Sequence, residues 1–304
     1  MAQWTARALA YDPRPMIELT VVIPAYNEAN GIRPAVTQLA AVLARSGIAH
    51  EVLIVDDGST DGTGEAIAEL SAKLPAVRAI SHAVNRGYGA ALKTGIGAAA
   101  APVIAITDAD GTYPEDSLPG LYRELVARNA DMVVGARTGG NVHIPLVRRP
   151  AKAVLRLLAN YLTGKKIPDL NSGLRVFRRE PVMERFNLIS DGFSFTTTVT
   201  MALLARNKAV IFVPIDYRKR TGSSKIRPIA DTFNFTVLIL RVSIYFEPLK
   251  VFLPVSGVLA AGGLVYGGVQ VNQGNLGEGP VLLLVSGLQV FCVGLIADMI
   301  SRKN

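Results

Sequence analysis

Cysteine, histidine and tryptophan are scarce in this chain of 304 residues, which has one cysteine, three histidines and one tryptophan. A single cysteine, Cys292, leaves no partner for a disulfide within the chain and no second thiol for a Cys-x-x-Cys metal site. The histidines lie far apart, at His50, His82 and His143, and form no His-x-x-x-His pair. The sequence therefore does not favour a disulfide scaffold or a zinc enzyme.

Charged residues are also few. They make up 18% of the chain, whereas 50% of the residues are hydrophobic. This balance excludes intrinsic disorder, which requires low hydrophobicity and high net charge. The same balance argues against a wholly water-soluble protein. The length of the chain allows one large domain or two modest ones of ~150 residues each.

Several common motifs of catalysis and nucleotide binding are missing. There is no Gly-x-x-x-x-Gly-Lys-Ser/Thr sequence, which excludes a P-loop, and no Gly-x-Ser-x-Gly sequence, which excludes the usual serine hydrolase. The short Gly87-Tyr88-Gly89 stretch lacks the third glycine of a dinucleotide-binding fingerprint.

Long uncharged runs are present only near the C-terminus. Residues 251–277 contain no charged side chain, and neither do residues 280–297. A membrane-spanning helix needs ~20 mostly apolar residues, so each run is long enough, although a buried helical hairpin of a soluble core is the alternative. Lys250, Arg302 and Lys303 flank the two runs, and residues 272–279 between them carry no lysine or arginine. The positive-inside rule then predicts that both ends, and everything before them, lie in the cytoplasm.

The net charge of +8 lies entirely before residue 251, because the four charges after it cancel. No acid occurs between Asp131 and Asp169 or between Asp216 and Asp231, and these two segments are rich in arginine and lysine. A basic face beside a membrane anchor indicates attraction to anionic lipid or phosphate. Nucleic acid is the other usual partner of such a basic chain, but the anchor and the lack of any nucleic-acid-binding motif argue against it.

The first half of the chain alternates short apolar strands with helices. This order predicts an α/β fold with a mostly parallel sheet covered by helices on both faces. The expected strands are residues 17–24, 51–55, 76–80, 103–107 and 131–135, and the expected helices are residues 28–46, 87–101 and 118–128, with another beginning at 61. The second half predicts helices at 146–162 and 195–205 and strands at 172–177 and 209–215. Residues 231–246 are expected to form an interfacial amphipathic helix, with a plain core helix as the alternative.

Polar clusters follow three of the predicted strands, at residues 24–28, 56–63 and 108–110. Parallel sheets bind ligands at the carboxyl ends of their strands, so these clusters are expected to line one pocket. Asp108 and Asp110 are the sharpest chemical signal, because two carboxylates at positions i and i+2 of an extended segment point to one side. Such a pair can hold a hard divalent cation whose remaining ligands are diphosphate oxygens and water.

These motifs together resemble family 2 glycosyltransferases of the GT-A fold. The sequences that carry the resemblance are VIPAYNE at 22–28, VDDGSTDG at 55–62, NRG at 85–87 and DAD at 108–110. DLNSGLR at 169–175, GSSK at 222–225 and the two C-terminal runs make the chain similar to the polyprenyl-phosphate glycosyltransferases, the group that includes dolichyl-phosphate mannose synthase.

The resemblance implies a site for a nucleotide sugar and a metal. Its nucleotide-sugar residues would be Pro24, Tyr26, Glu28, Asp57, Asn85, Asp108, Ala109, Asp110, Arg218, Arg220 and Lys225. Mg²⁺ or Mn²⁺ would be held by Asp108 and Asp110, with Thr112 where relatives often have glutamine. The family pattern leaves open whether Arg218 or Arg220 is the matching arginine.

The resemblance also implies a site for a lipid phosphate. Its cations would be Arg137, Arg148, Arg149 and Lys152. Asp169 is a further candidate catalytic residue, which would orient the acceptor or the sugar, or would instead pair with Arg175. The implied reaction is an inverting transfer of a sugar from a UDP- or GDP-linked donor to a polyprenyl phosphate on the cytoplasmic face of the cell inner membrane or its equivalent. The glycine-rich spans also allow a homo-oligomer.

Two alternatives remain. One is a membrane glycosyltransferase that uses a lipid or glycan hydroxyl as acceptor, although the QxxRW motif of processive synthases is absent because Trp4 is the only tryptophan. The other is a non-catalytic membrane adaptor, which the intact Asp108 and Asp110 disfavour. The predicted domain order is an N-terminal extension at 1–16, with no apolar core for a signal peptide, a catalytic domain at 17–228, an interfacial helix at 229–248 and a two-helix anchor at 249–304.

Overall fold

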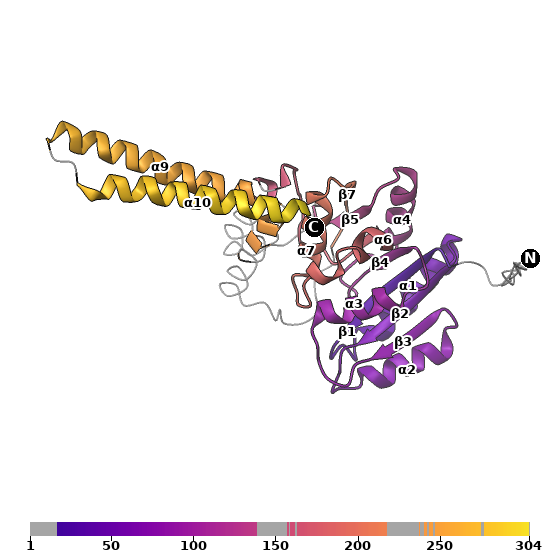
Figure 1. Ribbon diagram of the computed structural model, residues 1–304. Helices are drawn as coiled ribbons and strands as arrows, with labels where there is room; N and C mark the ends of the chain where they lie inside the picture. Colours follow the sequence, from indigo (N-terminus) through magenta and orange to yellow (C-terminus); the bar gives the residue numbers. More distant parts are fainter. Residues whose placement is uncertain are drawn as a thin grey trace, which may run out of the picture.

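An α/β domain and a long helical hairpin make up the structure, with the hairpin extending away from the domain (Figure 1). The computed structural model describes residues 17–138, 157, 159–161, 163–217, 237, 240–241, 243–245, 247–274 and 277–303. The predicted helices 146–162 and 231–246 therefore lie largely outside the described residues.

A seven-stranded sheet forms the centre of the domain, in the order β3-β2-β1-β4-β6-β5-β7. Its strands are β1 (Leu19–Ala25), β2 (His50–Asp56), β3 (Val77–Ser81), β4 (Val103–Ile106), β5 (Met132–Ala136), β6 (Arg175–Arg178) and β7 (Val210–Pro214). Every pairing is parallel except those of β6, which runs antiparallel to both β4 and β5. The predicted mostly parallel α/β sheet is thus confirmed.

Helices cover both faces of this sheet. One face packs against α1 (Ile32–Ser46), α2 (Thr63–Lys73) and α4 (Ser117–Ala127), and the other against α3 (Tyr88–Ala98), α6 (Arg179–Met183) and α7 (Phe195–Ala205), which follows a short 3₁₀ helix at Phe186–Leu188. Covering both faces explains why β1 and β4 are buried at every position. The small residues of α3 bring it close to the sheet, since a Cβ on Gly95 would lie 2.3 Å from Cγ1 of Val22.

The first predicted helix begins later than expected. It was expected from residue 28, but residues 27–31 form a loop in which Asn27 has a positive φ of 54°. The predicted strand 172–177 is likewise shorter, because residues 172–174 belong to the loop before β6. Both differences place loop residues at the edge of the sheet where the polar clusters lie.

The hairpin consists of α9 (Pro248–Asn272) and α10 (Glu278–Lys303), which lie side by side along their length (Figure 1). Glycines bring the helices together: a Cβ on Gly263 would lie 2.8 Å from Cγ of Leu284, and one on Gly287 would lie 3.1 Å from the Ser256 carbonyl oxygen. Both helices are long and apolar enough to cross a membrane, and only 11% and 17% of their most apolar stretches are buried. Such low burial does not support the alternative of a buried core hairpin.

The base of the hairpin is fixed to the domain. The Tyr161 hydroxyl donates a hydrogen bond to the Lys250 carbonyl at 3.2 Å. Val251 of α9 packs against a small apolar cluster that includes Met201 and Leu204 of α7. The hairpin therefore begins directly against the second half of the domain.

Candidate active site

Two loops at the carboxyl ends of β1 and β2 interlock through hydrogen bonds between one loop's backbone and the other's side chains. The Asn27 amide donates to the Ser59 hydroxyl at 3.0 Å, and the Thr60 amide donates to the Asn27 side-chain oxygen at 2.9 Å. The Glu28 amide donates to the Thr63 hydroxyl at 2.9 Å. These bonds bring the predicted clusters 24–28 and 56–63 to one place, as the rule on strand ends led us to expect.

Asp57 fixes a third segment beside these loops. Its carboxylate accepts hydrogen bonds from His82 Nδ1 at 2.7 Å and from the amides of Arg86 and Gly87 at 3.0 and 2.8 Å. Gly58, with a φ of 71°, packs so tightly on Val84 and Asn85 that a Cβ would lie 2.6 Å from the Val84 carbonyl carbon. Asp57 is only 3% exposed, so it holds the segment that presents the exposed Asn85.

Asp108 and Asp110 follow β4 at the same edge of the sheet. The Tyr88 hydroxyl donates to Oδ1 of Asp108 at 2.9 Å, and the Thr112 hydroxyl donates to Oδ1 of Asp110 at 2.7 Å. The two aspartates do not lie on an extended segment as expected, because residues 109 and 110 form a turn that ends at Gly111, with a φ of 66°. Their shared location therefore comes from the turn and its hydrogen bonds.

The surroundings of this turn fit a divalent metal that is shared with a substrate. Gly31 lies against the turn, where a Cβ would be 3.1 Å from the Ala109 carbonyl oxygen and 3.7 Å from Oε2 of Glu28. Gly173 packs closely against Asp108, since a Cβ there would lie 2.9 Å from Oδ2. Among the described residues, no three His, Cys, Asp or Glu side chains gather as a complete metal site. Two carboxylates in one turn suit Mg²⁺ or Mn²⁺, which commonly take their remaining ligands from phosphate and water.

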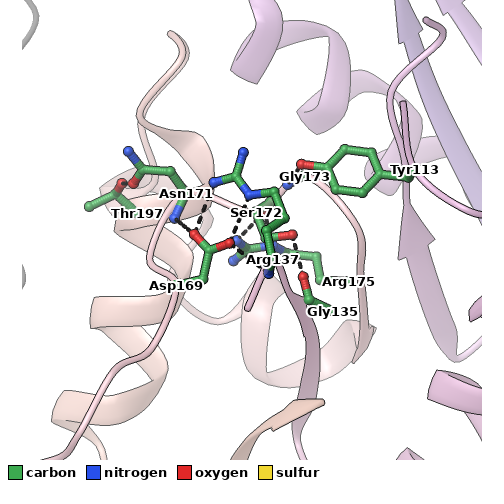
Figure 2. A network of polar contacts seen from close by, with 9 residues as sticks. All are labelled: Tyr113, Gly135, Arg137, Asp169, Asn171, Ser172, Gly173, Arg175 and Thr197. Carbon is green, nitrogen blue, oxygen red and sulfur yellow. Dashed lines mark hydrogen bonds and ion pairs between the residues drawn. The ribbon is translucent and has the colours of Figure 1, made fainter. Parts of the chain in front are cut away.

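Arg137 and Asp169 form a two-pronged ion pair, shown near the centre of Figure 2. Nε and Nη2 of Arg137 donate to the two carboxylate oxygens at 2.7 and 2.9 Å, and the Arg137 amide donates at 3.0 Å. Burial alone raises the pKa of the Asp169 carboxyl, but the hydrogen bonds and charge of Arg137 outweigh it and lower the pKa from 3.8 to about 2. Asp169 is therefore a stable anion at neutral pH, and it pairs with Arg137 rather than with Arg175.

Tyr113 and Tyr217 lie beside the ion pair of Arg137 and Asp169. The Tyr217 ring lies 5.4 Å from the Arg137 guanidinium carbon, and Tyr113 meets Tyr217 edge to face at 5.3 Å. The Tyr113 hydroxyl accepts a hydrogen bond from the Gly173 amide at 2.6 Å (Figure 2). Burial raises the pKa of Tyr113, so its hydroxyl stays protonated. The tyrosines thus connect the Arg137 pair with the backbone next to Asp108.

The structure brings the predicted residues Pro24, Tyr26, Glu28, Asp57, Asn85, Asp108, Ala109, Asp110 and Thr112 to one edge of the sheet, with Arg137 and Asp169 at the ends of neighbouring segments. Six other predicted residues, Arg148, Arg149, Lys152, Arg218, Arg220 and Lys225, lie outside the described residues.

Sequence reasoning missed four residues that shape the site: His82, Tyr88, Tyr113 and Gly173. Tyr88 lies beside the NRG sequence and Gly173 lies within DLNSGLR. Both motifs were identified, but no function was assigned to these two residues. His82 and Tyr113 gave no signal, because each acts through a contact with a residue that is distant in the sequence.

The comparisons with known proteins agree with this geometry. A family model described as Glycosyl transferase family 2 matches residues 20–186, and one described as GtrB C-terminal hairpin matches residues 247–302. The dolichyl-phosphate hexose transferase of Haloferax volcanii is 31% identical over 214 residues, which cover 70% of this chain and 88% of that protein. The dodecaprenyl-phosphate galacturonate synthase of Rhizobium johnstonii is 27% identical over 306 residues, with coverage of 96% and 90%.

A solved structure shares the fold. Glucosyl-3-phosphoglycerate synthase from Mycobacterium tuberculosis, in complex with Mn²⁺, uridine diphosphate and phosphoglyceric acid, aligns with a TM-score of 0.56 at 20% identity. The alignment covers 74% of this chain and 78% of that one. The expected GT-A fold is thereby confirmed, together with the two apolar C-terminal helices.

Proposed function

Because the chain belongs to glycosyl transferase family 2, we propose that it transfers a sugar from a nucleotide sugar to the phosphate of a polyprenyl phosphate at a membrane surface. The observation that carries this proposal is the direct attachment of an apolar hairpin, matched by its own family model, to the family 2 domain. The names of two relatives, which specify dolichyl and dodecaprenyl phosphate, support the choice of acceptor.

The loops after β1 and β2 form the nucleotide end of the site in this proposal. Pro24 near the end of β1 and Tyr26 and Glu28 after it contact the base and ribose, and Asp57 acts there by holding the segment that presents Asn85. Tyr26 is 37% exposed, and in this proposal its ring stacks on the base. Arg218 or Arg220, together with Lys225, is predicted to cover the diphosphate.

Asp108 and Asp110 mark the diphosphate end of the site. In the proposed reaction they hold Mg²⁺ or Mn²⁺, and Tyr88 and Thr112 orient the two carboxylates. When bound, such a metal would supply Lewis-acid stabilisation of the charge on the departing diphosphate. The presence of Mn²⁺ and uridine diphosphate in the complex of the fold relative supports this assignment.

The acceptor needs little help from a base. A phosphate monoester has a second pKa near ~6, so it is largely a dianion at neutral pH. Arg137 holds both carboxylate oxygens of Asp169 and lowers its pKa, so Asp169 is poorly suited to act as the base that a hydroxyl acceptor requires. Asp169 instead fixes Arg137, whose guanidinium has N–H groups beyond those that Asp169 takes. Arg148, Arg149 and Lys152 are predicted to add charge for the same phosphate.

The proposed step is one displacement. An oxygen of the lipid phosphate forms a bond to the anomeric carbon of the sugar, and the bond from that carbon to the nucleoside diphosphate breaks. The nucleoside diphosphate leaves with the bonding electron pair, and the anomeric configuration inverts. The protein accelerates this step by orientation and by neutralising phosphate charge.

The test is transfer by the purified full chain in lipid vesicles. Polyprenyl phosphate and a panel of radiolabelled UDP- and GDP-sugars are supplied with and without EDTA, and label that enters the organic phase is counted. We expect transfer from one donor that EDTA abolishes, no transfer by Asp110→Asn, and normal transfer by Asp131→Asn, a control at the opposite edge of the sheet. Transfer only to a lipid or glycan hydroxyl would refute the phosphate acceptor, and no transfer by folded protein would favour an adaptor.

We also propose that the catalytic domain faces the cytoplasm. Lys250 lies at the base of α9 and Arg302 and Lys303 lie at the end of α10, and the positive-inside rule supports this orientation. Protease protection of sealed inside-out membrane vesicles tests it. Digestion of the catalytic domain in such vesicles is expected, whereas protection would reverse the orientation.

A further inference from the structure

The bulkiest fully buried side chain in the described part of the protein is a charged one, Arg175. It begins β6, where it pairs with Ile106, two residues before Asp108. Its Nη1 donates to the Thr196 carbonyl at 2.9 Å and to the Thr200 hydroxyl at 2.8 Å. Arg175 therefore reaches from the site end of the sheet into the first turns of α7.

The same guanidinium also holds the loop before β6. Nε of Arg175 donates to the Ser172 carbonyl at 3.1 Å, and Nη2 donates to the same oxygen. Among the described residues, its hydrogen-bond acceptors are backbone carbonyls, a hydroxyl and, at 4.0 Å, the sulfur of Met132, and none is a carboxylate. Burying a cation without an ion pair is unfavourable, so packing alone does not account for an arginine at this position.

The loop that Arg175 holds carries the contacts of the active site. Ser172 precedes Gly173, whose missing Cβ makes room for the Asp108 carboxylate. Three residues earlier, Asp169 binds Arg137. The loop is also hydrogen-bonded from Ser172 to the Gly135 carbonyl and from Thr197 to Asn171 at 2.8 Å (Figure 2). Arg175 is the member of this network that joins loop, sheet and α7.

We propose that Arg175 is a positioning residue of the active site: its grip on the Ser172 and Thr196 carbonyls holds Gly173 against Asp108 and keeps Asp169 in place for Arg137. This role rests on the proposed transfer reaction. Arg175 touches neither substrate, so its effect reaches the reaction only through the loop.

A matched control lies on the same strand. Arg178 ends β6 and donates to the Ala130 carbonyl at 3.1 Å and to the Asn129 side chain at 2.9 Å. It pairs with Val103, at the opposite end of β4 from Asp108. Replacing Arg178 therefore removes a similar set of hydrogen bonds far from the loop.

The experiment compares Arg175→Lys, Arg175→Met, Arg178→Lys and Arg178→Met in the full chain. Backbone hydrogen exchange of the peptide covering 169–175, the melting temperature, and kcat and KM for both substrates are measured. We expect Arg175→Lys to remain folded, to exchange faster at 169–174 and to lose about tenfold or more in kcat, with KM for the nucleotide sugar changed less than about threefold. We expect Arg178→Lys to change none of these.

The comparison of kcat with KM separates positioning from packing. A residue that only packs would lower the melting temperature without changing kcat of the folded protein, whereas loss of positioning lowers kcat in protein that remains folded. If Arg175→Met does not fold, the hydrogen exchange and kcat of Arg175→Lys test the proposal. Normal exchange and kcat in folded Arg175→Lys would overturn the proposal, as would equal losses in the Arg175 and Arg178 variants. If the Arg175 variants exchange faster but the protein uses a different acceptor, the proposed reaction is refuted. The role of Arg175 in holding the loop then still stands.

Discussion

The α-carbon of Gly173 lies so close to Asp108 that an added Cβ would stand 2.9 Å from Oδ2 and 3.0 Å from Oδ1 of its carboxylate. A glycine in the loop before β6 thus decides where the first aspartate of the DAD sequence can lie. The Gly173 amide also donates a hydrogen bond to the Tyr113 hydroxyl, which helps to fix the backbone at this position.

Gly173→Ala tests this relationship. The new methyl group would displace the Asp108 carboxylate, so we expect kcat/KM to fall about tenfold or more and the metal concentration for half-maximal rate to rise. Gly120→Ala is the control, because a Cβ at Gly120 of α4 meets no atom within 4 Å. It should keep full activity and stabilise the helix by about 0.5–1 kcal/mol. Equal activity of the two variants would contradict the prediction.

Asp169→Asn should destabilise the protein. Loss of the charge leaves Arg137 largely buried without its ionic partner, which costs about 2–4 kcal/mol after allowance for its partial exposure. The measurement is thermal unfolding of the full chain in detergent, with Glu69→Gln as control because Glu69 forms only exposed ion pairs. A melting temperature no lower than that of Glu69→Gln would show that the Arg137 pair contributes little.

The pH dependence of transfer should follow the acceptor and not Asp169. The lowered pKa of Asp169 means that its stabilising effect is complete above pH 3.8 and is lost as the pH falls through about 2. The second ionisation of a phosphate monoester lies near pH ~6. Initial rates measured from pH 4.5 to 8.5 should therefore rise through about pH 6 and then level off. A midpoint near pH 8 would point to a different ionising group.

Tyr88→Phe removes the hydroxyl that donates to Asp108. A hydrogen bond to a charged group contributes about 1.5–3 kcal/mol, so we expect the metal requirement to rise roughly tenfold. Titration of transfer rate with Mn²⁺ measures the change, and Tyr122→Phe on α4, away from the aspartates, is the control. The prediction fails if both variants give the wild-type titration curve.

Gly287→Leu should separate the helices of the hairpin. A side chain at Gly287 would meet the backbone of α9 at Ala260 and Ser256, which cannot move aside as a flexible side chain can. Overpacking of this kind costs about 1–3 kcal/mol. Unfolding in detergent should therefore begin at a lower temperature than for Gly268→Leu, whose position has no atom within 4 Å of a Cβ. Indistinguishable curves would show that the close approach of the two helices adds no stability.

Much of the fold could be predicted because buried parallel strands leave a strong pattern. The apolar run at 103–107 predicted β4, the acids after it mark the proposed metal end of the site, and residues 195–205 coincide with α7. The antiparallel direction of β6 could not be predicted, since strand direction depends on which neighbours the chain reaches. The sequence of a four-residue strand does not indicate whether the strand runs parallel or antiparallel to its neighbours.

The contacts within the site were harder to predict than its members. Arg137 and Asp169 were both identified, but their pairing with each other links residues 32 positions apart and left no motif. Arg175 was considered only as a partner for Asp169, because a buried arginine bound to carbonyls looks the same in sequence as an exposed one. Sequence patterns give residue types and strand ends, whereas hydrogen-bond partners follow from the three-dimensional path of the loops.

The bond between Tyr161 and the Lys250 carbonyl has a consequence for how the protein meets its acceptor. In the proposed reaction, a hairpin base fixed to the domain holds the active site near the bilayer, and the lipid acceptor reaches it by lateral diffusion. The encounter rate then depends on the mole fraction of polyprenyl phosphate in the membrane and not on its amount per volume of solution. Dilution of the same quantity of acceptor into more bilayer should slow transfer, even though the bulk concentration is unchanged.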